Sequence, residues 1–388
     1  MPQKIRTTHV GSLPRPEELV PFLRSRHQDQ PVDEAAFAAA CRRAVLDCVA
    51  KQVACGVDIV SDGEMAKISY AYYVQDRLNG LESADVVAQR NVTLRRFQTM
   101  AISEPEFPDY SAARAKAPGG PASAKPPVCT GPLSYRDAGP VNGDLALLKE
   151  AVRQAHAPSC FMTAASPGVI AMFASETSHY ATEDDYVFGL AEAMKPEYAA
   201  IAKAGVTLQI DCPDLPLAKR MNYASGEVDP HRIIARNIEA ANIAIGDIPG
   251  DRVRLHLCWG NYAGPHTHDL PVTELFPLLR KTKARALSFE AANPRHEHEW
   301  EDWRSAGLPD DMVLIPGVID SVTNFVEHPR LVAQRIGHFV DAVGGERVIA
   351  GADCGFGTFA ASTPTVFPSI VWEKLRVLSE GAAMASGG

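Results

Sequence analysis

The stretch of this chain that decides its fold is Val253-Arg254-Leu255-His256-Leu257-Cys258-Trp259-Gly260. It is a short apolar run that ends in glycine, and His256 and Cys258 are two residues apart within it. In a β-strand this spacing points both side chains to the same face. Imidazole and thiolate are ligands that zinc prefers, so the stretch predicts a strand that ends at a metal site.

Two further candidate ligands end apolar runs downstream. Glu290 closes the run that begins at Ala286, and Cys354 closes the run that begins at Val348. A free cysteine is often only a small buried hydrophobe, but a glutamate that closes an apolar strand seldom stays buried without a partner. As a set, the four residues that predict one tetrahedral zinc site are His256, Cys258, Glu290 and Cys354.

Similar apolar runs alternate along the chain with Ala-rich amphipathic stretches, a pattern typical of parallel α/β folds. The predicted strands are Thr7–Ser12, Val57–Glu64, Val128–Pro132, Phe161–Pro167, Val206–Pro213, Val253–Asn261, Ala286–Asn293, Val313–Asp320 and Val348–Gly355. The predicted helices are Glu34–Cys55, Asp144–Ala157, Glu183–Ala204, Pro230–Gly246, Pro329–Val343 and Pro364–Glu380. We therefore expect an α/β fold that is a single (β/α)8 TIM-type barrel, with functional groups at the carboxyl ends of its strands.

The number of runs exceeds by one what such a barrel needs. We expect the first, Thr7–Ser12, to be an extra amino-terminal segment across the barrel mouth, so that the barrel uses the eight runs from Val57 to Cys354. Residues 85–127 interrupt the pattern and are rich in Pro, Ala, Lys and Gly toward their end, which predicts a long loop insertion. No domain boundary is evident, so residues 1–388 are expected to form one domain.

The composition excludes several classes of protein. The net charge of −9 argues against a nucleic-acid partner, which usually requires a basic face. No apolar run is long enough to span a bilayer, so we expect no membrane partner. The 8 cysteines are scattered along the chain and do not form a disulfide framework, which predicts a reducing, cytoplasmic environment where thiolate ligands persist.

Three segments are candidates for substrate binding. The carboxylates of Glu64 and Asp211 close two predicted strands and could hold an amino group or act as a base, and the turn around Gly11 offers backbone amides to an anion. Each could instead be a capped turn before a helix, but this alternative fits Asp214 better than Glu64 or Asp211. Four other histidines are expected to face solvent or to act as hydrogen-bonded supports: His266, His268, His296 and His298.

Taken together, these segments resemble the cobalamin-independent methionine synthase family, specifically its catalytic carboxyl-terminal barrel. The resemblance runs from Arg6 to about Glu380. The motifs that carry it, in order, are Thr-Thr-His-Val-Gly-Ser-Leu-Pro-Arg, Asp-Gly-Glu, Gln-Ile-Asp-Cys-Pro-Asp, His-Leu-Cys-Trp-Gly-Asn, Phe-Glu-Ala, Pro-Gly-Val-Ile-Asp and Asp-Cys-Gly. Each is weak alone, and their order and spacing make the match.

The resemblance implies a function and assigns residues to it. It places zinc on the four predicted ligands and the amino acid end of homocysteine on Gly11, Ser12, Glu64 and Asp211, of which Glu64 and Asp211 are the catalytic candidates. Further implied substrate contacts are His9, Arg15, Trp259 and Asp320. A thiol titrates near ~8.5 and is deprotonated when it coordinates zinc, and the thiolate then takes a methyl or alkyl group from a small-molecule donor.

The donor is left open by two departures from the family. The synthases carry a histidine two residues after the aspartate of their Gly-Val-x-Asp segment, where this chain has Val322 after Asp320. No tryptophan follows Pro167 to stack on a folate ring. 5-Methyltetrahydrofolate therefore remains one candidate donor.

Three alternatives stay open. The chain also resembles the epoxyalkane:coenzyme M transferases, around Arg-Leu-His-Leu-Cys-Trp-Gly and Pro-Arg-His-Glu-His-Glu-Trp, and a sulfonate would then bind arginines such as Arg6, Arg15 or Arg295. A non-catalytic zinc- or thiol-binding protein is a second alternative. The related uroporphyrinogen decarboxylase type needs no metal and would leave His256 and Cys258 without a role.

Overall fold

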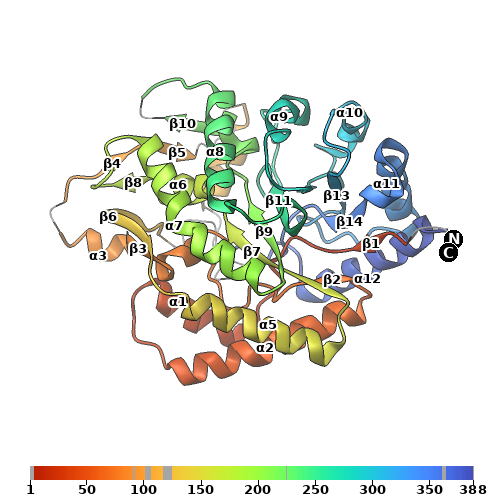
Figure 1. Ribbon diagram of the computed structural model, residues 1–388, viewed down its shortest axis with the longest axis horizontal. Coiled ribbons are helices and arrows are strands. Elements are labelled where there is room, and N and C mark those ends of the chain that lie inside the picture. The colour runs from red at the N-terminus through yellow and green to blue at the C-terminus, as the bar shows by residue number, and fades with distance from the viewer. Residues whose placement is uncertain are drawn as a thin grey trace.

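The computed structural model describes residues 4–90, 92–100, 106–116, 125–223, 225–360 and 364–387. Its centre is a sheet of eight strands in the order β1-β14-β13-β12-β11-β9-β7-β2 (Figure 1). All neighbours pair in parallel, and a bridge from Thr8 to Ile59 joins the first strand of this order to the last. The strands are β1 (Arg6–Thr7), β2 (Ile59–Val60), β7 (Ser159–Ala165), β9 (Thr207–Asp211), β11 (Val253–Leu257), β12 (Ala286–Phe289), β13 (Val313–Ile319) and β14 (Ile349–Ala352). The predicted (β/α)8 barrel is confirmed.

The prediction was wrong about which runs form the barrel. The amino-terminal run is not an extra segment, because Arg6–Thr7 is a barrel strand paired with β14. Val128–Pro132, predicted as a barrel strand, belongs instead to β6 (Val128–Tyr135), which pairs with β3 (Leu78–Glu82) and β8 (Glu176–Thr177) outside the barrel. The physical reason is burial: most of β6 is partly or fully exposed, whereas barrel strands are buried on both faces.

Helices surround the barrel, and each of the six predicted helices overlaps an observed one. Polar caps fix several of their starts: the Asp33 carboxylate accepts hydrogen bonds from the first amides of α2, and the Thr182 hydroxyl accepts one from the first turn of α7. The helices around the barrel are α1 (Val20–His27), α2 (Glu34–Ala54), α5 (Gly139–Ala155), α6 (Pro167–Phe173), α7 (Glu183–Lys203), α8 (Pro230–Ile245), α9 (Val272–Leu279), α10 (Trp300–Trp303), α11 (Pro329–Val343) and α12 (Pro368–Ala385). In the described part of the chain, no helix has the length and apolar character of a membrane span.

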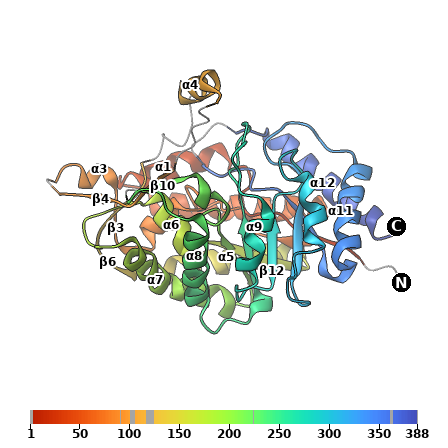
Figure 2. The same ribbon diagram turned by 90° about the horizontal axis from the view of Figure 1, so that it is seen from above.

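Between β2 and α5 the chain leaves the barrel. The described part of the predicted insertion 85–127 is not featureless, since it holds the rest of α3 (Ala84–Val87), β4 (Arg95–Arg96), β5 (Gln98–Met100) and α4 (Pro108–Lys116). Figure 2 shows α4 standing apart from the barrel body. β5 pairs with β10 (Met221–Tyr223), which follows β9, so the excursion is tied to the barrel. Residues 91, 101–105 and 117–124 lie outside the described residues, and the assignment of 1–388 to one domain stays a prediction.

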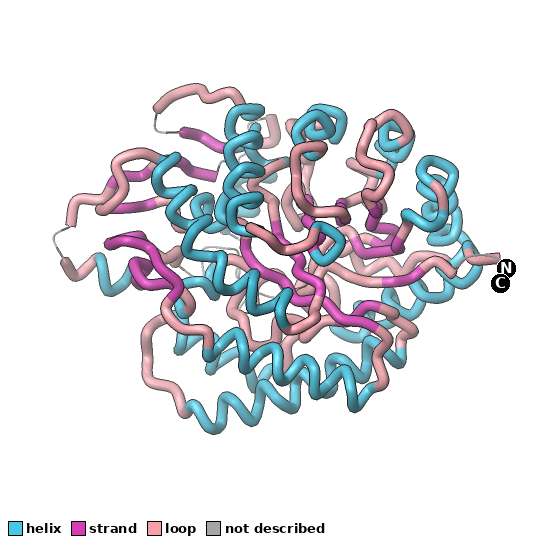
Figure 3. Tube along the Cα trace, in the orientation of Figure 1, coloured by secondary structure: helices cyan, strands magenta, loops and turns pink. Residues whose placement is uncertain are grey.

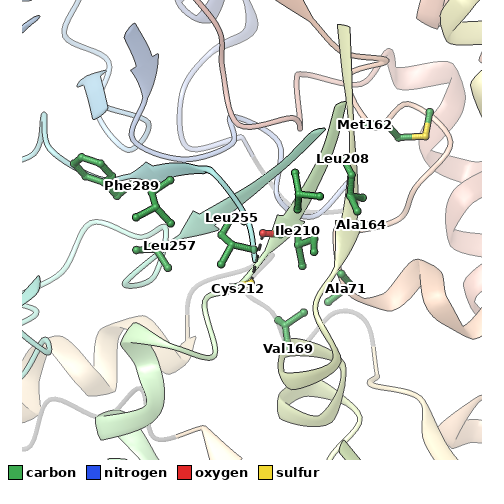
Figure 4. Close-up of a cluster of buried hydrophobic side chains, with 14 of the residues drawn as sticks. Ala71, Met162, Ala164, Val169, Leu208, Ile210, Cys212, Leu255, Leu257 and Phe289 are labelled. Atoms are coloured by element: carbon green, nitrogen blue, oxygen red, sulfur yellow. Dashed lines mark hydrogen bonds between the residues drawn. The ribbon is translucent and has the colours of Figure 1, made fainter. Parts of the chain in front are cut away.

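Alternation along the strands separates two environments. Leu208, Ile210, Leu255 and Leu257 join the main apolar cluster, together with helix residues such as Val169 (Figure 4). A separate cluster comes from four different barrel strands and consists of Ile59, Phe161, Ile315 and Ile349. Because strand residues alternate between faces, this second cluster fills the barrel interior, near the strand starts. The tube in Figure 3 shows how the helices enclose these strands.

Candidate metal and thiol site

Three of the four predicted ligands meet at the carboxyl end of the barrel. His256 lies on β11, Cys258 follows it, and Cys354 follows β14. Their ligand atoms all lie within 4.8 Å of one another, and the two sulfurs are 3.4 Å apart. All three side chains are buried. The sequence separation of Cys354 from the other two is removed by the barrel, which brings the strand ends together.

The His256 ring is poised to act as a ligand. Its Nδ1 lies 3.3 Å from the Ser288 hydroxyl, whereas Nε2 is buried and has no hydrogen-bond partner among the described residues. Burial and the nearby positive charge of Arg254 lower the pKa of His256 to about 3. The ring is therefore neutral at pH 7, with a lone pair free for a metal. A buried, unpartnered ring nitrogen beside two sulfurs fits zinc well.

The two thiols are placed where a cation would stabilise them. The hydrogen bond with Cys354, burial and the negative charge of Glu290 raise the pKa of the Cys258 thiol well above its usual range. The Gly260 amide donates a hydrogen bond to the Cys258 sulfur at 3.4 Å. A divalent ion between the sulfurs would offset their mutual repulsion and hold both as thiolates.

Glu290, the fourth predicted ligand, lies beside this cluster but is not part of it. Its Oε1 accepts a hydrogen bond from the Trp259 amide at 2.8 Å. Its Oε2 accepts one from Asn293 at 2.9 Å and pairs with Arg295 at 2.5 Å. The structure therefore assembles three ligands, with a carboxylate adjacent that is held by three donors.

Two more predicted carboxylates lie at the same end of the barrel. Asp211 is the register partner of His256 on β9, and Glu64 accepts a hydrogen bond from the Thr163 hydroxyl of β7 at 2.9 Å. Burial and the negative charge of Glu64 raise the pKa of Asp211 to about 8. Two buried carboxylates that repel each other favour a cation between them, such as the ammonium of an amino acid.

The predicted turn around Gly11 completes this end of the barrel. Gly11 has φ 141°, and a Cβ there would lie 2.5 Å from Thr163 Cγ2 and 3.1 Å from Glu64 Oε1, so glycine is required. The Phe356 amide donates to the Ser12 carbonyl at 2.8 Å, which joins the turn to the loop that carries Cys354. Arg15 pairs with Glu64 at 3.4 Å. Ser12, Glu64 and the metal-binding cluster are thus parts of one assembly.

Three predicted substrate contacts have other partners. The Trp259 ring is fully buried and its indole N–H donates to the Leu270 carbonyl at 2.7 Å. His9 is also buried, with one ring nitrogen 2.7 Å from Gln52 and the other accepting from the Gly11 amide. These two residues shape the site from behind.

The third, Asp320, forms its own turn. Its carboxylate accepts hydrogen bonds from the Val322 and Thr323 amides and from the Thr323 hydroxyl. The residue therefore has a turn-forming role, and its substrate contact stays a prediction.

The expectation that all four loop histidines are solvent-facing or mere supports was wrong for two of them. His266 and His296 are buried, and each lies within 3.2 Å of the Asp269 carboxylate. Hydrogen bonds to Asp269 and Glu299 outweigh burial and raise the pKa of His296 to about 9. The i,i+3 spacing of His266 with Asp269 and of His296 with Glu299 was the signal available in the sequence.

The sequence reasoning also missed Tyr70, a half-buried residue of the loop after β2. Burial, and after it the negative charges of Cys258, Cys354 and Asp211, raise the pKa of the Tyr70 hydroxyl well above its usual value. The phenol is therefore a neutral hydrogen-bond donor near the sulfurs. No spacing in the sequence marks it.

Comparison with known proteins places this geometry among characterised relatives. No protein-family model matches the chain. It is 23% identical to a methionine synthase of Saccharolobus solfataricus over 97% of this chain and 93% of that protein. It is 24% identical to a 2-hydroxypropyl-CoM lyase of Xanthobacter autotrophicus over 90% of this chain and 89% of that protein.

A solved structure extends the comparison to the fold. The B12-independent methionine synthase of a Shewanella species, crystallised with selenomethionine, superimposes with a TM-score of 0.71, at 19% identity over 98% of each chain. At that identity the likeness shows the fold alone. The resemblance drawn from the motifs is confirmed: over nearly its whole length the chain is similar to curated methionine synthases and to a 2-hydroxypropyl-CoM lyase, and it has the fold of a B12-independent methionine synthase.

Proposed function

We propose that this protein is a zinc-dependent S-methyltransferase that resembles cobalamin-independent methionine synthase and methylates homocysteine or a similar small thiol. The observation that carries the proposal is the cluster of His256, Cys258 and Cys354, whose ligand atoms lie within 4.8 Å of one another at the barrel mouth. The relatives' names and the shared fold support the same reaction class.

Each part of the chain has a role in the proposed reaction. A zinc ion on the cluster lowers the pKa of the substrate thiol and keeps it as a thiolate. Glu64 and Asp211 hold the ammonium of the acceptor, and the turn at Gly11 and Ser12 receives its carboxylate. The sulfur then bonds to the methyl carbon, while the bond from that carbon to the donor breaks and its electron pair stays with the donor.

The charges around the cluster favour an amino acid thiol over coenzyme M. Two adjacent buried carboxylates, Glu64 and Asp211, attract an ammonium and repel a sulfonate. Two of the arginines considered for a sulfonate are already paired: Arg15 with Glu64, and Arg295 with Glu290. The third, Arg6, has an exposed side chain on β1.

The donor is the least constrained part of the proposal. 5-Methyltetrahydrofolate is the first donor to test, because the relatives include methionine synthases. The alkyltransferase alternative, opening of an epoxide by coenzyme M, has its support in the similarity to a 2-hydroxypropyl-CoM lyase. A non-catalytic zinc- or thiol-binding protein remains the third candidate.

Zinc X-ray absorption on the purified protein, alone and with each thiol, tests the proposal. A new sulfur in the zinc shell with homocysteine, followed by methionine formation from 5-methyltetrahydrofolate, is the expected result. A new sulfur only with coenzyme M would favour epoxide opening. Zinc and thiol binding without transfer from any donor would favour the non-catalytic alternative, and a metal-free protein with full activity would refute the proposal.

A further inference from the structure

The carboxylate of Glu290 is fully engaged although it lies next to three metal ligands. It is 3% exposed, and its two oxygens accept from the Trp259 amide, the Asn293 side chain and Arg295. The ion pair with Arg295, at 2.5 Å, is the shortest of these contacts. In a buried setting such a charge-assisted bond is strong, so Glu290 is drawn toward Arg295 and away from the sulfurs.

The guanidinium that holds Glu290 is itself fixed. Arg295 donates from Nε and from its backbone amide to the Asn293 side-chain oxygen, at 3.0 and 3.1 Å. Asn293 is in turn held by Asp353, whose Oδ2 accepts its amide hydrogen at 2.8 Å. Arg295 also lies 3.8 Å from Asp269. Every group around Arg295 therefore keeps it in place against Glu290.

This arrangement has a consequence for the fourth metal position. A tetrahedral zinc ion held by His256, Cys258 and Cys354 has one position left, and a catalytic zinc site needs that position for its substrate. A free carboxylate one hydrogen bond from Trp259, the residue after Cys258, would compete for it. The ion pair withholds that competitor.

We propose that Arg295 is a positioning residue that keeps Glu290 off the metal and so reserves the fourth position for the sulfur of the thiol substrate. The inference deepens the proposed function and rests on it. Arg295 contacts neither the metal cluster nor the thiol, and acts through Glu290.

Four variants test this: Arg295→Met, Glu290→Gln, the double variant, and Arg236→Met as a control. Arg236 forms an equally buried ion pair with Glu183 and Asp184, between α8 and α7, so its loss reports the general cost of removing such a pair. The measurements are zinc affinity, by competition with a chromogenic chelator, homocysteine affinity of the zinc-loaded protein, and its zinc X-ray absorption.

In Arg295→Met the released carboxylate should bind the metal. We expect zinc affinity to rise and homocysteine affinity to fall, each by about tenfold. Adding Glu290→Gln should restore homocysteine affinity, because the competing carboxylate is gone. Glu290→Gln alone should change neither quantity much, and neither should Arg236→Met.

The inference is overturned if Arg295→Met binds homocysteine like the unmodified protein, or if Glu290→Gln alone weakens zinc binding strongly, since Glu290 would then already be a ligand. A general loss of structure would lower both affinities and would not be rescued by the second substitution, which also counts against it. Failure of the proposed function looks different: homocysteine would add no sulfur to the zinc shell of the unmodified protein.

Discussion

Arg254 and His256 are two residues apart on β11 and both project into the barrel, yet their surroundings are opposite. Arg254 donates to Gln209 at 2.7 Å, to the Thr8 hydroxyl at 3.0 Å and to the His9 carbonyl at 2.9 Å, and its guanidinium lies 3.5 Å from the centre of the Phe161 ring. His256 has a buried nitrogen with no partner among the described residues. Only the second residue is left unsatisfied by the fold.

The comparison separates two uses of buried polar groups. The interior around Arg254 is closed: the chain supplies every partner, so the polar groups there hold β1 against β9 and β11. The end around His256 is open, because its nitrogen and two sulfurs converge where the chain supplies no cation. Burial of a polar group without a partner is costly, and a fold that retains it points to a ligand.

The largest effect is expected from removing the open end's sulfurs. Cys258→Ser and Cys354→Ser should each reduce bound zinc and methyl transfer to background, because a hydroxyl replaces a thiolate in a three-ligand site. Metal analysis and methionine formation measure this. Cys212→Ser, a buried cysteine whose thiol donates to the Ile210 carbonyl, is the matched control and should retain zinc. Equal zinc loss in the control would dissolve the distinction.

The closed layer should respond in stability instead. Arg254→Met leaves the Gln209 oxygen and the His9 carbonyl without their buried donor, and should lower the free energy of unfolding by about 3 kcal/mol. Urea denaturation measures the loss. Zinc content of the folded variant should stay at the level of the unmodified protein. If Arg254→Met is as stable as the parent, the layer is not held together as described.

Asp211 joins the two regions, and its substitution should show a pH signature. Its pKa is raised from 3.8 to about 8 by burial and by Glu64, so the folded state binds the proton more tightly, and stability falls as pH rises through this window. Asp211→Asn has no charge to form. It should raise the free energy of unfolding by about 1–3 kcal/mol near pH ~9 and leave it almost unchanged near pH ~4.

Unfolding curves at the two pH values test this prediction, and homocysteine binding should weaken in the same variant. A variant that is stabilised equally at both pH values would show that charge is not the cause. Glu64→Gln is the companion measurement, because removing its charge should lower the pKa of Asp211.

The smallest effect concerns the support of the His256 ring. Ser288→Ala removes the hydroxyl that lies 3.3 Å from Nδ1 and should weaken zinc binding by about tenfold, or about 1.4 kcal/mol, without abolishing it. A chelator competition measures the change. Unaltered zinc affinity would mean that strand packing alone orients the ring.

Much of this organisation was readable from local pattern. The period of two at His256 and Cys258 predicted a strand with both ligands on one face, and alternating runs predicted the barrel. The assignment of strands failed at β1 and β6, because which runs close a barrel depends on pairing between distant segments. The position of Glu290 failed to follow from its strand end for the same reason: its carboxylate is oriented by Asn293 and Arg295.

The sequence by itself determined the ligand types, their places at strand ends and the fold class, because these depend on side-chain chemistry and on periods of two and 3.6 residues. Only the tertiary structure decided which groups meet. The pairing of β1 with β14 brings Ser12 to the Cys354 loop, the register of β9 and β11 sets Asp211 beside His256, and the Arg295 ion pair separates Glu290 from the sulfurs. These are contacts between segments far apart in the chain, and no local pattern encodes them.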